Sequence, residues 1–418
     1  MIGVRHCRAA AAGLAALAAA ACVPQAGLPV ASGQGAAPAG SASREWTYPV
    51  GSMSDYTSTR NLIGSHTAMD RIFQSRPIAA ASAPLPLRPG PDPTPEIRFS
   101  HGGRDWTLDS YLAATSTTAF LALRRDGTIV VERYLHQRRP EDRFASWSMA
   151  KTVVAMLVGL AVQDGRIRSL DDPVSAYVPG LADSAHGPVP IRHVLTMSSG
   201  VGFEEAYGRP GSDISRLALG SLHGHARGGV ATVDWISRRA AQPGALFNYA
   251  SADTQVLGLV LSAATGQSLA ALTEERIWRP MGAEFPANWL IDRAGQEVAF
   301  CCMNAALRDY GRLGLLMAND GRALDGRQVL PAAWVQAMMT PSAGAGAPGG
   351  GYGYQMWLST GVEYASFFGV RGQQISVHRA SGMVFVRTAA NDQESNPADR
   401  LFLGSLVRAM VAQFATGP

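Results

Sequence analysis

The residues best suited to chemistry in this sequence are Ser148 and Lys151, which stand three positions apart. Lys151 is the one lysine among 418 residues, and every other member of the combined lysine and arginine count of 36 is arginine. A buried lysine can lose its proton, whereas a guanidinium effectively cannot. This single lysine therefore indicates a position that needs a base.

The stretch that must position this pair is the apolar run from residue 153 to 162, which predicts a helix buried on all sides. Residues i and i+3 share one helix face, so the Ser148 hydroxyl can contact the Lys151 amine. The positive end of the helix dipole disfavours a second positive charge and favours an oxyanion. The pair is predicted to be a nucleophile with its own base, although this spacing also occurs by chance.

Tyr249 and Ser251 form a second candidate group, between a turn at Pro243 and Gly244 and an apolar run at 254–264. The pattern predicts a loop that presents a phenol and a hydroxyl at the start of a helix. A tyrosine whose pKa is lowered beside a lysine can carry protons to and from a serine and a leaving group. A loop tyrosine is also often structural, so this pair alone does not establish chemistry.

The remaining elements predict an α+β fold. A hairpin is expected around Asp126 and Gly127, and the region from about 166 to 325 is mostly helical by pattern. Late strands are expected at 354–358, 365–370, 373–378 and 383–387, before a closing helix at about 399–414. Strands at both ends of the chain predict an antiparallel sheet flanked by helices, with an all-helical lobe inserted between them.

The N-terminal segment has the composition of a bacterial export signal. Two arginines, an Ala/Leu run and small residues precede Cys22, which predicts a signal at 1–21. In the lipoprotein form of such a signal, Cys22 is lipidated, so the protein is expected in the periplasm or anchored at the outer membrane. A flexible linker at 22–45, an irregular segment at 46–105 and a folded domain at 106–418 are expected to follow.

Composition restricts partners and cofactors. The sequence pI is about 9.0 with a net charge of +4, but the arginines are scattered, which argues against a nucleic-acid partner. No metal or cofactor is predicted, and the expected partner is a small molecule. Cys301 and Cys302 are predicted to be small buried residues rather than a disulfide, because disulfide geometry fits adjacent residues poorly.

The order of the two groups, Ser148-x-x-Lys151 and then Tyr249-x-Ser251, resembles the penicillin-recognising serine hydrolases. The chain is most similar to the class C β-lactamase-related branch that includes 6-aminohexanoate-dimer hydrolases and family VIII carboxylesterases. Segments at 196–201, 277–282 and 308–314 share this likeness. The resemblance implies a β-lactamase/DD-peptidase-like fold from about residue 119 to the end.

The resemblance also implies roles for individual residues. Ser148 would be the acyl-forming nucleophile, Lys151 its base and Tyr249 the second acid/base. Ser251 replaces an asparagine of class C enzymes, which disfavours β-lactam turnover. Tyr207 is similar to a substrate-contacting tyrosine of the nylon-oligomer enzymes.

The third motif of that family is a strand that lines the cleft, and this sequence contains no segment with the same residues. Its best candidate contains Gly369, Arg371 and Gly372, which could supply the second oxyanion donor and contact substrate. Because the sequence has no second lysine, binding of a substrate carboxylate would fall to an arginine such as Arg371 or to no residue at all.

Together these features predict an exported serine hydrolase that cleaves amide or ester bonds through an acyl-enzyme on Ser148. The first hypothesis is an enzyme similar to 6-aminohexanoate-dimer hydrolases, and the alternative is a carboxylesterase. A β-lactamase or D-Ala-D-Ala peptidase comes third. The hypothesis from another class is a catalytically silent binding module with the same fold.

Overall fold

The computed structural model describes residues 47–415, which belong to a single compact unit. The predicted signal at 1–21, Cys22 and the linker at 22–45 lie outside the described residues. Within the described part, no single helix is long and apolar enough to cross a membrane. One pair, Ser251–Thr265 with Leu269–Trp278, meets that test only together, across a bend of 80°.

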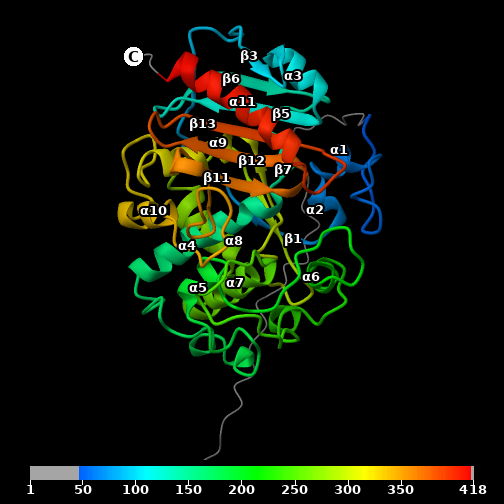
Figure 1. The fold of residues 1–418 in the computed structure, drawn as a ribbon, viewed down its shortest axis with the longest axis vertical. Coiled ribbons are helices and arrows are strands. Elements are labelled where there is room, and N and C mark those ends of the chain that lie inside the picture. The colour runs from blue at the N-terminus through cyan, green and yellow to red at the C-terminus, as the bar shows by residue number, and fades with distance from the viewer. Residues whose placement is uncertain (1–46, 416–418) are drawn as a thin grey trace, which may run out of the picture. The chain divides into compact units, whose positions relative to one another are not determined.

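The main sheet has seven strands and joins the two ends of the folded chain (Figure 1). Its order is β10-β11-β12-β13-β5-β6-β2. The bounds are β2 Arg88–Pro89, β5 Thr117–Leu123, β6 Thr128–Tyr134, β10 Trp357–Leu358, β11 Tyr364–Gly369, β12 Gln373–His378 and β13 Val384–Ala389. β13 pairs antiparallel with β5, with Arg387 opposite Phe120. The predicted hairpin and the predicted sheet built from both chain ends are therefore confirmed.

Helices cover both faces of this sheet. All seven residues of β5 are buried, and those from Ala119 to Leu123 alternate between two hydrophobic clusters. Phe120 and Ala122 pack with α3 (Leu108–Ala114) and α11 (Pro397–Phe414), which crosses the front of the sheet in Figure 1. Leu121 packs on the other side, where α9 (Leu307–Ala318) lies. A strand buried on both faces explains the nearly continuous apolar sequence of β5.

Two smaller sheets complete the β-structure. One has the order β1-β8-β9-β7, with β1 Ser75–Ile78, β7 Arg143–Ala145, β8 Ala287–Leu290 and β9 Met303–Ala306; the other pairs β3 Arg98–His101 with β4 Arg104–Thr107. The segment at 46–105, expected to be irregular, thus contributes β1 to β4 and the short helices α1 (Leu62–Ser65) and α2 (Met69–Ile72). Strands of two to four residues are too short to show a clear sequence period, so the pattern did not predict them.

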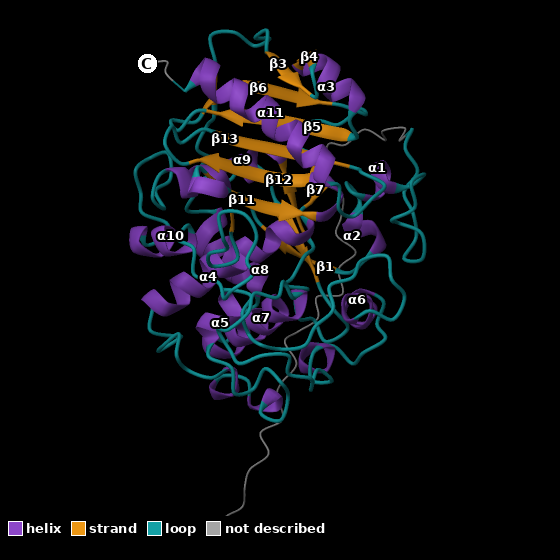
Figure 2. Cartoon of the chain, in the orientation of Figure 1, coloured by secondary structure: helices purple, strands orange, loops and turns teal. Residues whose placement is uncertain are grey.

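The other helices lie mainly beyond the edge of the main sheet, as Figure 2 shows. Their bounds are α4 Ala150–Gln163, α5 Ile191–Leu195, α6 Asp213–Leu222, α7 Ser251–Thr265, α8 Leu269–Thr273 and α10 Ala332–Met338. α4 is buried from Ala150 to Ala161 and packs against α7, which confirms the predicted buried helix. The range 166–325 also contains β8, β9 and α9, and the inserted helical lobe stays a prediction.

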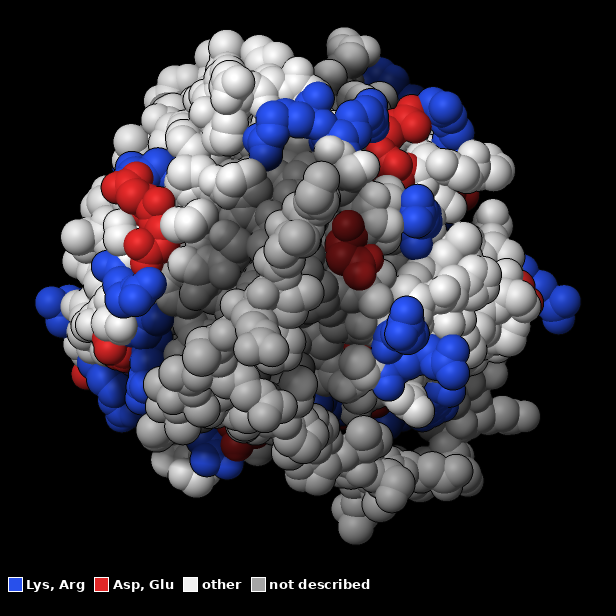
Figure 3. Space-filling model, turned by 90° about the horizontal axis from the view of Figure 1, so that it is seen from below, with Lys and Arg blue, Asp and Glu red and all other residues white. Residues whose placement is uncertain are grey.

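Charge is distributed rather than concentrated on the face in Figure 3. Basic side chains form several separate groups there, with acidic side chains among them. This agrees with the scatter of arginines along the sequence.

Candidate active site

The candidate nucleophile lies in a tight turn between a strand and a helix. β7 ends at Ala145, and Ser148 lies in a single helical turn, Trp147–Met149, that continues into α4. Trp147 has φ of 46°, the left-handed region that side chains other than glycine rarely occupy. Such a backbone persists only where its surroundings fix it, and these positions cluster at functional sites.

Two contacts fix this turn. The Trp147 indole donates to Nε2 of His66 over 3.3 Å, and burial, followed by the charge of Arg371, lowers the pKa of His66 to about 3. The imidazole is therefore neutral and can accept this bond. At Gly369, which ends β11, an added Cβ would lie 2.4 Å from the carbonyl oxygen of Ser146. Only glycine lets β11 approach the turn this closely.

The amine of Lys151 connects three groups. Its Nζ lies 3.0 Å from Ser148 Oγ, 3.1 Å from Ser251 Oγ and 2.7 Å from the carbonyl oxygen of Phe300. The side chain is almost fully buried, and desolvation lowers its pKa to about 8, against the opposing charge of Glu205. The predicted contact between Ser148 and Lys151 is present, and the amine can be neutral near physiological pH.

These contacts determine where the lone pair of Lys151 points. A neutral amine has two N–H donors and one lone pair. The Phe300 carbonyl can only accept, and the Ser251 hydroxyl accepts because it donates its own proton to Glu205 over 2.5 Å. Both N–H donors are then engaged, and the lone pair faces Ser148. In this arrangement the neutral amine can accept a proton from the Ser148 hydroxyl.

Glu205 is a functional residue that the sequence interpretation missed. Its carboxylate accepts from the backbone N–H and the hydroxyl of Ser251, and from the hydroxyl of Tyr207 over 2.5 Å. The preceding Glu204 pairs instead with Arg209. Adjacent glutamates in a loop look alike in a sequence, and the one available signal was that Glu205 stands two residues before a candidate tyrosine.

Tyr249 lies beside the same amine. Lys151 Nζ is 5.2 Å from the centre of the Tyr249 ring, and the Trp357 ring packs against it at 5.1 Å. Burial and the charge of Glu205 raise the pKa of Tyr249, and a hydrogen bond with Ser148 opposes this only in part. The expectation of a lowered tyrosine pKa was therefore wrong, because burial raises the pKa and the charge of Glu205 adds to that effect. Tyr249 is a neutral phenol at neutral pH and can donate a proton.

A cavity of about 390 Å³ opens onto Ser148. Its lining is largely aromatic and aliphatic near the nucleophile, with Tyr56, Trp147, Ile214, Leu222, Phe300 and Val370. The predicted residues Tyr207 and Ser251 also line it. Tyr207 is 37 % exposed, although its hydroxyl end reaches Glu205. Ser148, Ser251 and Tyr207 therefore line one cavity, while Lys151 and Tyr249 lie behind Ser148 and are not among its lining residues.

The predicted third-motif residues divide into different roles. Arg371 lines the cavity, but its guanidinium bonds to Glu394 and to the carbonyl oxygens of Asn391 and Asp392. This pairing disfavours capture of a substrate carboxylate. Gly372 has φ of 92°, and a Cβ there would lie 2.8 Å from the side chain of Asn391, so its role is to allow this close packing. Substrate contact by any of these residues stays a prediction.

Cys301 and Cys302 correct another expectation, because the two residues form a disulfide. The general rule against bonding adjacent cysteines assumes an ordinary extended backbone. Here Cys302 has φ of 78°, in the left-handed region. Sequence alone gives no indication of this conformation, and so the prediction of two unbonded cysteines was wrong.

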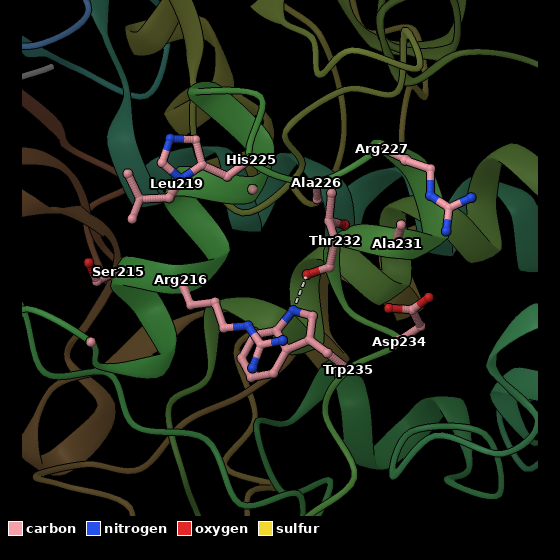
Figure 4. A pocket seen from close by; sticks show the side chains of 12 residues that line it. Ser215, Arg216, Leu219, His225, Ala226, Arg227, Ala231, Thr232, Asp234 and Trp235 are labelled. Atoms are coloured by element: carbon pink, nitrogen blue, oxygen red, sulfur yellow. Dashed lines mark hydrogen bonds between the residues drawn. The ribbon is translucent and has the colours of Figure 1, made fainter.

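A second cavity, of about 580 Å³, lies along another side of α6 (Figure 4). The Arg216 guanidinium stacks over the Trp235 ring at 3.9 Å, and the indole donates to the carbonyl oxygen of Thr232. None of Ser148, Lys151 and Tyr249 lines it. This cavity is therefore not lined by the candidate nucleophile or its neighbours, although Ser215 borders both cavities. Among the described residues, no cluster of histidine, cysteine or acidic side chains is suited to hold a metal ion.

A serine beside a buried lysine and a partly buried tyrosine, next to a mainly antiparallel sheet with helices on both faces, is the arrangement expected of a serine hydrolase type of protein. Comparison with known protein families supports the same class of protein. Residues 107–406 match the Beta-lactamase family, and the chain belongs to that family. The β-lactamase and penicillin-binding protein type of fold implied by the sequence is confirmed.

Three individual proteins show which members of this family the chain is similar to. The chain is 28 % identical over 350 residues to a 6-aminohexanoate-dimer hydrolase from Paenarthrobacter ureafaciens, covering 77 % of this chain and 84 % of that protein. It is 32 % identical over 158 residues to Esterase EstB from Burkholderia gladioli, covering 34 % and 38 %. A solved structure, a putative 6-aminohexanoate-dimer hydrolase from Bacillus anthracis, superposes with a TM-score of 0.77 at 22 % identity, covering 86 % and 96 %.

Proposed function

We propose that this protein cleaves amide or ester bonds through an acyl-enzyme on Ser148. The observation that carries this proposal is the set of contacts of Lys151 Nζ with the Phe300 carbonyl oxygen, Ser251 Oγ and Ser148 Oγ. The first two can take both N–H donors of the neutral amine, which would leave its lone pair toward Ser148 Oγ. A buried lysine with a pKa of about 8 can act as a general base near neutral pH.

In the acylation step, Lys151 takes the Ser148 proton as Oγ attacks the substrate carbonyl carbon. The negative charge then develops on the former carbonyl oxygen. The backbone N–H of Ser148 and the N–H groups at the end of β11, at Gly369 and Val370, would stabilise it. The close approach of Gly369 to Ser146 and the position of Val370 on the cavity wall support an oxyanion donor at the end of β11.

Collapse of the intermediate breaks the bond to the leaving group, which needs a proton if it is an amine. Tyr249 supplies that proton in its neutral form, and the proton held by Lys151 can replace it. Water then attacks the acyl carbon, gives its proton to the same pair of groups, and releases the acid as Ser148 regains its proton. Each proton removed in one step is returned in the next.

An amidase similar to the 6-aminohexanoate-dimer hydrolases is the first candidate, because that relative spans most of both chains. A carboxylesterase is the second, supported by the match to Esterase EstB and by the apolar lining near Ser148. The ion pair between Arg371 and Glu394 argues against penicillins, whose carboxylate would lack a free arginine there.

The decisive experiment compares kcat/KM for a linear 6-aminohexanoate dimer and for a short-chain p-nitrophenyl ester, with Ser148→Ala as the blank. Serine-dependent amine release supports the amidase, whereas ester cleavage alone assigns the protein to the carboxylesterases. A fluorophosphonate probe that fails to label Ser148 would refute both and leave the binding-module hypothesis.

Export also belongs to this proposal, supported by the composition of residues 1–21. The substrate would then be a small molecule met outside the cytoplasm. Fractionation of cells that express the full chain, with Cys22→Ser to remove the acceptor of a lipid, tests both export and anchoring.

A further inference from the structure

The disulfide between Cys301 and Cys302 lies on the wall of the catalytic cleft. Cys301 lines the same cavity as Ser148. The residue before it, Phe300, provides the carbonyl oxygen that accepts from Lys151 over 2.7 Å. A covalent ring is therefore attached directly to one of the three groups that orient the candidate base.

The backbone on both sides of the ring is also fixed. The Trp289 indole donates to the carbonyl oxygen of Cys301 over 2.9 Å. The backbone N–H of Leu290 donates to the carbonyl oxygen of Cys302 over 3.0 Å. Cys302 holds a left-handed φ of 78°. A residue with a side chain keeps this conformation only where other constraints require it. The disulfide and these two bonds supply such constraints.

The direction of the Lys151 lone pair depends on this arrangement. If the Phe300 carbonyl moves away, one N–H of the neutral amine loses its acceptor, and the amine can rotate so that an N–H points at Ser148. A base in that orientation cannot accept the serine proton. Small displacements of a catalytic group can reduce rates by large factors.

We propose that Cys301 and Cys302 are positioning residues whose disulfide holds the Phe300 carbonyl on Lys151, and that opening this bond lowers the hydrolase activity. The cleft thus contains a redox-sensitive control of the enzyme. The inference rests on the proposed role of Lys151 as the base.

The switching reaction is an exchange with a small dithiol that enters through the cleft. One thiolate attacks a cysteine sulfur, the bond between the two cysteines breaks, and a mixed disulfide forms. The second thiolate of the dithiol then attacks the mixed disulfide and displaces the cysteine that is still bound to the reagent. The protein gains two electrons and two protons as two thiols, and the dithiol is oxidised to its cyclic disulfide.

The test uses the full chain with Cys7→Ser and Cys22→Ser, so that Cys301 and Cys302 are the only cysteines left of four. The measured quantity is the rate at which a fluorophosphonate labels Ser148, because labelling needs the base but little substrate recognition. Rates are compared before and after treatment with dithiothreitol, after reoxidation, and in Cys301→Ser/Cys302→Ser. Mass spectrometry after alkylation counts the thiols.

We expect reduction to lower the labelling rate by about tenfold or more, and reoxidation to restore it. The double serine variant should label at the reduced rate, should not respond to dithiothreitol, and should show an altered pH profile. A matched variant, Cys301→Ala/Cys302→Gly, opens the ring but accepts the left-handed backbone, and should retain more activity than the double serine variant.

Equal labelling rates in the oxidised and fully reduced protein would overturn the proposal. If the double variants do not fold, the reduced protein with an unchanged circular dichroism spectrum decides the matter. Failure of the underlying function would look different, because oxidised protein and Ser148→Ala would then behave alike.

Discussion

Replacing Glu205 by glutamine should move the pH dependence of catalysis to lower pH. The carboxylate accepts from Ser251 over 2.5 Å, and Ser251 accepts from Lys151 over 3.1 Å, which keeps carboxylate and amine within about 5.6 Å. At an effective dielectric constant of about 20, two charges at that distance interact by about 3 kcal/mol. This attraction stabilises the ammonium form, so Glu205 raises the pKa of Lys151 against the effect of burial.

Lys151 acts as a base only when neutral, so activity should rise with pH through its pKa of about 8. Removing the carboxylate lowers that pKa, and an interaction of about 3 kcal/mol corresponds to about 2 pH units. Solvent in the cleft screens part of it, so we expect the acid limb of kcat/KM to move down by about 1 to 2 units. The plateau should fall as well, because Ser251 loses a charged acceptor.

The assay is kcat/KM for an uncoloured ester followed by pH-stat between about pH 5 and 10, since this quantity reports pKa values of the free enzyme. Glu204→Gln is the matched control, because Glu204 is the neighbouring residue but pairs with Arg209. An acid limb at the same pH in Glu205→Gln and in the parent protein would refute the electrostatic argument. If the plateau of kcat/KM falls but the acid limb stays at the same pH, Glu205 has a structural role only.

Three further substitutions test other parts of the site. Lys151→Arg should lose about as much labelling and turnover as Lys151→Ala, on the order of 10²-fold or more, because a guanidinium cannot accept the serine proton; retention of most activity would contradict that role. Tyr249→Phe should reduce amide turnover by about 10²-fold but p-nitrophenyl ester turnover much less, because only an amine leaving group needs the proton; equal losses would argue against the phenol as acid. Gly369→Ala should slow fluorophosphonate labelling and destabilise the fold by about 1–3 kcal/mol, measured by urea unfolding. The reason is that its Cβ would lie 2.4 Å from the Ser146 carbonyl oxygen. Unchanged stability would show that β11 can shift away from this turn.

The sequence predicted those parts of the fold and site that depend on local pattern. The apolar run after Ser148 predicted a buried helix, and α4 is buried from Ala150 to Ala161. The serine and lysine were predicted to touch because three residues is a helical spacing, and they lie 3.0 Å apart. The apolar run of β5 and the turn at Asp126 and Gly127 predicted the hairpin, because both signals depend on neighbouring residues alone.

What the sequence did not predict depends on contacts between distant segments. The Phe300 carbonyl belongs to a backbone group, which no residue type reveals. Glu205 acquires its contacts only because the loop that carries it folds against Ser251, and its charge adds to the effect of burial in raising the pKa of Tyr249. The disulfide requires a left-handed Cys302, which the surrounding hydrogen bonds impose.

Two of these missed groups affect the amine nitrogen of Lys151, because the Phe300 carbonyl accepts from it and the charge of Glu205 shifts its pKa. Burial lowers its pKa and Glu205 raises it, so the value of about 8 reflects two opposing effects. The carbonyl of Phe300 and the hydroxyl of Ser251 then fix the orientation of the neutral amine. A lysine buried without Glu205 would be a weaker base, and one without the two acceptors would be free to rotate away from Ser148. The proposed role of Lys151 therefore depends on the residues around it. For this reason the Ser148-x-x-Lys151 motif predicts a candidate base but not the pH at which its amine is neutral.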